Sequence, residues 1–182
     1  MPNVVALDPA EASPEVAAVY TDFEQRMGFP AAPNFIKAQG HSLDVVKGTW
    51  GLVGNVLARG QLPRALKEML FVAISHDRRC RYCEAAHVAC CRMLGVEAAA
   101  IEKVLASTPD LSPARSRDIL AFGLKCARDP QSLTPEDFAT LRSHELSEGE
   151  IVEVISMAAL AVYANIMADA LGVEPDAMFS EL

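Results

Sequence analysis

Apolar residues recur every three or four positions along almost the whole chain, which is the spacing of a buried helix face. In the segment that begins at Pro63, for example, Leu66, Met69, Leu70 and Ala73 fall on one side of a helix. No segment alternates polar and apolar residues for as long as a half-buried strand would. The sequence therefore predicts an all-α fold, with helices at 13–27, 42–58, 63–79, 81–94, 97–106, 113–128, 135–144 and 148–170.

The first forty residues are expected to form one helix and one loop. Ser13 is a suitable N-cap and Pro14 a suitable first helical residue. Residues 30–40 are rich in proline and glycine, so we expect a loop there with at most one turn. We predict a single helical domain over 1–182, in which residues 1–40 pack on a core of about 41–175.

Charge and the apolar segments argue against a nucleic-acid-binding protein and against a membrane-spanning protein. The net charge is −8 and the pI is near 5.0, which argues against a nucleic-acid partner, although Arg78, Arg79 and Arg81 form a local basic patch. The longest apolar segment, 151–170, contains Glu153 and is expected to be a buried core helix, not a membrane span. No export signal is evident, so the five cysteines indicate a reducing, cytoplasmic setting.

One tetrapeptide occurs twice in the chain. The tetrapeptide LGVE stands at 94–97 and again at 171–174, each time after an alanine-rich helix. It is compatible with two stacked helical half-repeats and equally with chance.

The strongest chemical signal is a cluster of cysteine and histidine. Cys80, Cys83 and His87 are spaced so that a helix places them on one stripe, which Cys90 and Cys91 are expected to continue. On the preceding helix, a carboxylate at Glu68 would face the cysteines if the two helices pack side by side.

These residue types suit thiol redox chemistry. A thiolate attacks peroxides and disulfides, and a histidine one turn away can take the thiol proton and later return it. Glu68 would orient His87, and a second cysteine would trap the oxidised sulfur as a disulfide. Cys83 is the nearer cysteine to His87, at about 6 Å of helix rise against roughly 10.5 Å for Cys80, so we assign Cys83 as nucleophile and Cys80 as resolving partner.

Two simpler interpretations of these residues are possible. The cysteines would be inert core residues if they were fully buried, but the arginines beside them argue against that. A zinc site of Cys80, Cys83, His87 and Cys90 needs donors about 3–4 Å apart, whereas one straight helix spreads them over about 15 Å. We therefore expect no metal and no bound cofactor.

The pattern Glu-x11-Cys-x2-Cys-x3-His, here Glu68 to His87, resembles the core of the alkylhydroperoxidase D family, within the carboxymuconolactone decarboxylase-like superfamily. The closing stretch from Asn165 to Gly172 is also similar to the uncharacterised peroxidase-related branch. The resemblance implies an all-helical protein that forms trimers or hexamers and reduces hydroperoxides. It implies Cys83 as peroxidatic residue, Cys80 as resolving residue and Glu68 with His87 as proton relay.

One position departs from the family pattern. A well-studied mycobacterial member has a relay histidine just before the second cysteine, where this chain has Tyr82. Whether Tyr82 replaces it as a relay residue is left open, and the thiol reductant that would recharge the enzyme is unknown. Two other functions remain as alternatives: a carboxymuconolactone-type decarboxylase, which has no use for a dithiol, and a non-enzymatic thiol redox sensor.

Overall fold

The structure is a computed structural model that describes residues 1–106 and 110–181, and over these residues it is helical without a strand. The all-α prediction is confirmed. The helices are α1 Pro14–Met27, α2 Asn34–Gln39, α3 Leu43–Leu52, the π-helical turn Val53–Leu57, α4 Arg64–Asp77, α5 Arg81–Met93, α6 Ala98–Leu105, α7 Ala114–Arg128, the short 3-10 turn Pro130–Ser132, α8 Pro135–Ser143, α9 Glu148–Leu171 and α10 Met178–Glu181.

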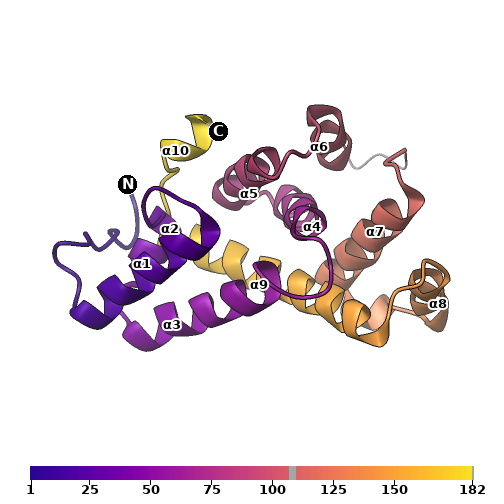
Figure 1. Ribbon diagram of the computed structural model, residues 1–182, viewed down its shortest axis with the longest axis horizontal. Helices are drawn as coiled ribbons and strands as arrows, with labels where there is room; N and C mark the ends of the chain where they lie inside the picture. The colour runs from indigo at the N-terminus through magenta and orange to yellow at the C-terminus, as the bar shows by residue number, and fades with distance from the viewer. Residues whose placement is uncertain (107–109, 182) are drawn as a thin grey trace.

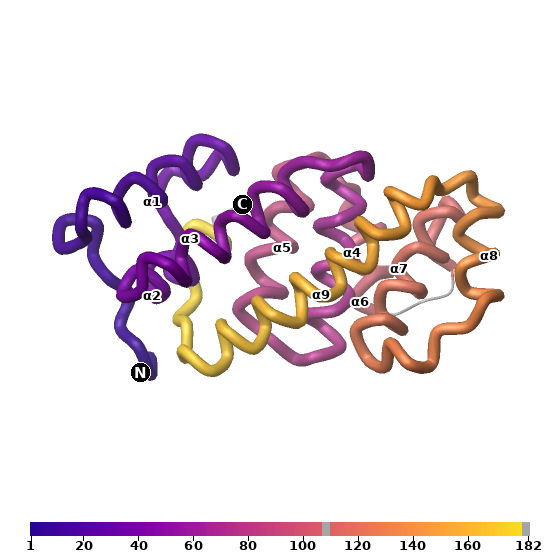
Figure 2. Tube along the Cα trace, turned by 90° about the horizontal axis from the view of Figure 1, so that it is seen from below, coloured from indigo at the N-terminus to yellow at the C-terminus, as the bar shows by residue number. Residues whose placement is uncertain are grey.

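Helix α4 is the centre of the fold. It packs against α5, α9 and α7, and every side chain from Leu70 to Ser75 is buried. The helices α1 to α3 form one end of the elongated molecule, and α7 and α8 form the other, while α9 runs beneath the centre (Figures 1 and 2). The candidate residues on α4 and α5 therefore lie in the middle of the molecule.

The long apolar helix α9 begins with a capping box, in which Ser147 and Glu150 satisfy each other's backbone N–H groups. It is long and apolar enough to cross a membrane by length and composition, and half of its most apolar window is buried within the protein. Val154, Met157 and Ala161 are fully buried against the neighbouring helices. This helix is thus part of the core, as the sequence suggested.

Two segments near the N-terminus differ from expectation. The predicted loop at 30–40 contains a short helix, α2, because Ile36 and Ala38 are buried there and Gln39 accepts a hydrogen bond of 2.5 Å from Thr49. The predicted helix 42–58 changes to a π-helical turn at Val53. Tertiary packing stabilises α2 in a stretch whose proline and glycine content disfavours helix by itself.

The two LGVE copies share a local structural role. Gly95 and Gly172 both have positive φ, at 75° and 64°, just after α5 and α9. The valine that follows each glycine donates a backbone hydrogen bond of 2.9 Å back into the helix, from Val96 to Cys91 and from Val173 to Ala168. This is a glycine-based helix stop. The shared stop gives the glycine of both copies the same local role, and the two stacked half-repeats stay a prediction.

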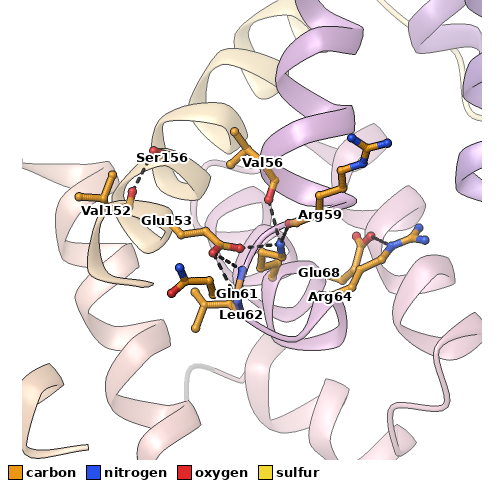
Figure 3. Close-up of polar contacts among 10 residues, drawn as sticks. Val56, Arg59, Gln61, Leu62, Arg64, Glu68, Val152, Glu153 and Ser156 are labelled. Atoms are coloured by element: carbon orange, nitrogen blue, oxygen red, sulfur yellow. Dashed lines mark hydrogen bonds and ion pairs between the residues drawn. The ribbon is translucent and has the colours of Figure 1, made fainter. Parts of the chain in front are cut away.

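A buried ion pair fixes the start of α4 against α9. Lys67 Nζ lies 2.7 Å from Glu153 Oε1 and also donates to the carbonyls of Val56 and Arg59. The other carboxylate oxygen accepts from the backbone N–H of Gln61, at 2.8 Å, so Glu153 holds both the loop and α4 (Figure 3). This network holds the turn of α4 that carries the neighbouring residue Glu68.

Candidate active site

Helix α5 begins at the cysteine pair. Cys80 is its N-cap residue, with φ −80° and ψ 94°, and its backbone N–H bonds the carbonyl of Ser75 at 2.9 Å. The tight turn from α4 is made by Arg79, whose φ is 61°. Cys83 follows in the first turn of the helix. All five cysteines are free thiols, and the two of the pair are buried, with 0% and 3% of their surfaces exposed.

Glu68 and His87 meet across the interface of α4 and α5. Glu68 Oε2 lies 2.5 Å from His87 Nδ1, and the second oxygen accepts a hydrogen bond of 3.2 Å from Arg64 Nε. Glu68 is fully buried, and among the described residues Arg64 and His87 form ion pairs with its carboxylate. Figure 3 shows Arg64 beside Glu68 at the start of α4. The predicted pairing of Glu68 with His87 is therefore present.

The imidazole of His87 is also held by an aromatic ring. Phe71, one turn after Glu68 on α4, stacks on it with a centroid distance of 3.5 Å and an interplanar angle of 17°. With Nδ1 on the carboxylate and one face on the phenyl ring, the orientation of the imidazole is fixed. The second ring nitrogen, Nε2, is thus available for proton transfer.

An apolar pocket with a cavity volume of about 60 Å³ lies beside these groups. Cys83, His87 and Cys90 line it from α5, so Cys83 borders open space in spite of its low exposure. Almost all of the remaining lining is apolar and much of it aromatic: Phe23, Met27, Phe29, Pro33, Phe35, Val53, Leu57, Phe71, Tyr82, Ala86, Ala164 and Phe179. The site is an apolar chamber with sulfur and imidazole in one wall.

The two cysteines of the pair are not equivalent. A hydrogen bond shared with Cys83, together with burial, raises the pKa of Cys80 well above its usual range. Cys80 therefore keeps its proton at neutral pH, as a resolving thiol does. Burial also raises the pKa of Cys90 strongly and that of Cys91 to about 12. Because a raised pKa keeps a thiol protonated, Cys80, Cys90 and Cys91 are each disfavoured as the attacking thiolate.

The sequence predicts that Cys90 and Cys91 both continue the stripe of Cys83 and His87, and this prediction is wrong for Cys91. Cys90 lines the pocket, whereas Cys91 packs with Met69 and Val72 on the other side of α5. Successive residues of an α-helix are about 100° apart, so both cannot follow Cys83 and His87 on the same face. Cys90 thus belongs to the pocket wall and Cys91 does not.

The donor atoms of Glu68, His87 and Cys90 lie within 4.8 Å of one another, and these three residue types can hold zinc. This group replaces the four-residue set considered from the sequence, because Glu68 comes from a second helix. Arg64 already bonds the carboxylate and brings a fixed positive charge to it. A bound cation would have to compete with that charge, so the set fits a metal by donor type and distance but not by charge.

Tyr82 is placed beside the cysteines but faces the C-terminal segment. Its hydroxyl donates to Asp176 Oδ2 at 2.7 Å and accepts from the backbone N–H of Phe35 at 3.1 Å. Burial and the charge of Asp176 raise the pKa of the phenol. The hydrogen bonds described for Tyr82 do not include Glu68 or His87, and its role as a relay residue stays a prediction.

Several residues of the site are not among those predicted from the sequence. Arg64 could have been found, because it precedes Glu68 by four residues on a helix. Phe71 and Phe179 give no signal of their own, since nothing in the sequence indicates which apolar residues line a pocket. Arg78 and Arg81 are exposed, and no described contact joins either of them to a thiol.

Comparisons with known proteins agree with this geometry. The sequence model of the carboxymuconolactone decarboxylase family matches residues 44–110. An uncharacterised peroxidase-related protein from Ralstonia eutropha JMP134, described as an alkylhydroperoxidase AhpD core, superposes with a TM-score of 0.88 at 23% identity over 98% of this chain and 94% of its own. No curated protein sequence matches the chain.

Two further structures are similar. A peroxidase-related protein from Silicibacter sp. TM1040 has a TM-score of 0.81 at 25% identity, over 96% of this chain and 93% of its own. The debrominase Bmp8, in a cysteine-to-alanine variant bound to 2,3,4-tribromopyrrole, has a TM-score of 0.81 at 24% identity, over 98% of this chain and 94% of its own. Proteins of this fold thus include one described as a debrominase and others described only as peroxidase-related.

Proposed function

The chain has the alkylhydroperoxidase D-like fold of the carboxymuconolactone decarboxylase-like superfamily, and on that premise we propose that it is a two-cysteine thiol peroxidase that reduces organic hydroperoxides. Cys83 is the attacking sulfur, Cys80 the resolving sulfur, and His87 with Glu68 the proton relay. The observation that carries this proposal is the 2.5 Å contact between Glu68 and His87 in the wall of a pocket that Cys83 also lines.

In the first step, His87 takes the proton of the Cys83 thiol. The thiolate attacks one oxygen of the hydroperoxide ROOH, the O–O bond breaks, and Cys83 becomes a sulfenic acid. The leaving alkoxide takes the proton from His87 and departs as the alcohol ROH. Glu68, paired with Nδ1, stabilises the imidazolium that exists between the two proton transfers.

In the second step, the sulfur of Cys80 attacks the sulfenic acid. Water leaves, and a disulfide joins Cys80 and Cys83. A thiol reductant of two R′SH then exchanges with the disulfide and restores both thiols, which releases R′SSR′. The sum is ROOH + 2 R′SH → ROH + H₂O + R′SSR′, so that two electrons pass from the reductant to the peroxide.

The test is a single turnover without oxygen. Reduced protein is mixed with less than one equivalent of cumene hydroperoxide, and thiols are counted before and after. We expect two thiols lost per peroxide consumed and a disulfide between Cys80 and Cys83 in the peptide map. Cys83→Ser should consume no peroxide, whereas Cys80→Ser should hold a sulfenic acid that dimedone traps on Cys83.

Cys126→Ser is the matched control, because that cysteine lies on α7, away from the pocket. It should behave like the parent protein. Peroxide consumption by Cys83→Ser at the parental rate would refute the proposal.

The aromatic pocket also supports a second candidate, the reductive removal of halogen from an aromatic ring. The Bmp8 structure is described as a debrominase with a brominated pyrrole bound. Two thiols supply the electrons for ArBr + 2 RSH → ArH + Br⁻ + H⁺ + RSSR, with Cys80 and Cys83 as the dithiol. Bromide release from 2,3,4-tribromopyrrole, measured beside hydroperoxide consumption, distinguishes the two reactions.

The decarboxylase alternative is less well supported. A carboxylated lactone needs a positive group to hold its charge, and His87 is the one cationic side chain among the residues described as lining the pocket. Since that imidazole is already paired with Glu68, the apolar wall favours an uncharged substrate.

A further inference from the structure

The C-terminal segment from Glu174 to Phe179 is fastened across the site by side chains of two other elements. Asp176 accepts from the backbone N–H of Asn34, at 3.0 and 3.1 Å to its two oxygens, and from the hydroxyl of Tyr82 at 2.7 Å. The side chain of Asn34 donates to the carbonyl of Glu174 at 3.1 Å. Figure 1 shows this segment, beyond α9, between α2 and α5.

This segment brings one aromatic side chain into the pocket. Phe179 is buried, with 6% of its surface exposed, and lines the same chamber as Cys83. Its ring meets those of Tyr82 and Phe29 edge to face, each at a centroid distance of 6.0 Å. A part of the pocket wall is therefore a segment of chain held by a few hydrogen bonds, and not a face of a long helix.

Asp176 joins this segment to both α2 and α5. Its partner Tyr82 is the residue directly before Cys83, so the same turn of α5 carries the reactive sulfur and the attachment point of the segment. A hydrogen bond to a charged acceptor is among the stronger ones in proteins. Loss of that bond would remove the hydrogen bond between the segment and α5, while the bonds to Asn34 and the contact of Glu68 with His87 remain.

We propose that Phe179, held in place by the hydrogen bond between Tyr82 and Asp176, is a specificity-determining residue that limits the size of the molecules that reach Cys83. This inference rests on the proposed function in so far as Cys83 is the reactive sulfur. Tyr82 and Asp176 are then positioning residues that act through Phe179. In this arrangement Tyr82, where the chain departs from the family pattern, positions the C-terminal segment, which is a role separate from proton transfer.

The experiment measures access to Cys83 directly, so that it does not depend on peroxidase activity. In the Cys80→Ser background, Cys83 is alkylated with a small reagent, iodoacetamide, and with a bulky one, N-(1-pyrenyl)maleimide, and both rates are read by peptide mass spectrometry. We expect the ratio of the bulky to the small alkylation rate to rise about tenfold in each of three variants, Asp176→Asn, Tyr82→Phe and Phe179→Ala. The first two weaken or remove the hydrogen bond that holds Phe179, and the third removes the ring itself.

Two matched variants serve as controls. Glu174→Gln removes a carboxylate from the same segment, where it lies 4.0 Å from the N-terminal amine, and Tyr163→Phe removes a phenol that bonds Thr49 instead. Neither should change the ratio. Phe179→Leu keeps an apolar side chain and should give a smaller increase than Phe179→Ala, which separates a wall effect from loss of folding.

Unchanged size selectivity in Asp176→Asn and Phe179→Ala, with folded protein by circular dichroism, would overturn the inference. If the alkylation ratio changes but no variant and no parent protein consumes hydroperoxide, the proposed function fails and the role of Phe179 stands. If peroxide is consumed and the alkylation ratio is the same in all variants, the proposed function stands and the role of Phe179 fails.

Discussion

Glu68 Oε2 lies 2.5 Å from His87 Nδ1, on helices whose residues are nineteen positions apart in the sequence. Glu68 is fully buried and the side chain of His87 is 14% exposed, so their interaction is stronger than the same pair would have on the surface. Arg64 bonds the opposite side of the carboxylate. The pair thus fixes the imidazole in the wall of the pocket that Cys83 also lines.

Glu68→Gln should slow hydroperoxide reduction by about 100-fold, the lower end of what a positioned acid–base group contributes. An amide cannot stabilise the imidazolium as a carboxylate does, while its shape preserves the packing. The measurement is the second-order rate of peroxide consumption. The matched control is Glu84→Gln, since Glu84 forms an exposed pair with His76 at 2.9 Å. A control as slow as Glu68→Gln would contradict a specific role for the buried pair.

Lys67→Met should lower the free energy of unfolding by about 3–5 kcal/mol, because it leaves the Glu153 carboxylate without its cation in a buried position. The double variant with Glu153→Gln should recover part of this loss, since the amide oxygen can still accept from Gln61. Urea denaturation gives both values. Equal stability of the single and double variants would mean that the uncompensated charge is not the cause.

Acid should weaken the link between α4 and α7. The hydrogen bond from Arg128 holds the pKa of Asp77 below its ordinary value of about 3.9. A carboxyl group with a lowered folded pKa stabilises the protein above its unfolded pKa, and this stabilisation is lost as the pH falls below about 4. Asp77→Asn should therefore be less stable than the parent at pH 7, and the difference should shrink at pH 3. Thermal unfolding at both pH values measures this, and a constant difference would contradict it.

We propose that the exposed apolar face of α9 is a subunit interface in the trimer or hexamer that the family resemblance implies. Val152 and Ile166 lie fourteen residues apart on this helix and are 61% and 54% exposed. Ile166→Glu should lower the mass found by light scattering, whereas Val5→Glu, at an exposed position near the N-terminus, should not. A parent protein that stays monomeric at all concentrations would contradict this prediction.

The sequence by itself determined the helices and the pairing at the centre of the site. The three-to-four spacing of apolar residues predicts α4, α5 and α9 within one or two residues of their observed ends, because local periodicity and capping govern a helix. Helix geometry alone places Cys83 and His87 one turn apart, with Cys80 at the N-cap of the same helix. Glu68 needed one further assumption, that two consecutive helices pack side by side, and the structure has that arrangement.

What only the tertiary structure decided depends on contacts between residues far apart in the chain. Helix α2 exists because α3 and the C-terminal segment give its residues burial and hydrogen-bond partners, which no local propensity supplies. Cys90 and Cys91 separate into pocket and packing because of where α4 touches α5. Asp176 meets Tyr82 from ninety-four residues away. A spacing rule describes one helix, whereas a pocket wall is built from several, and their packing places Phe179 beside Cys83.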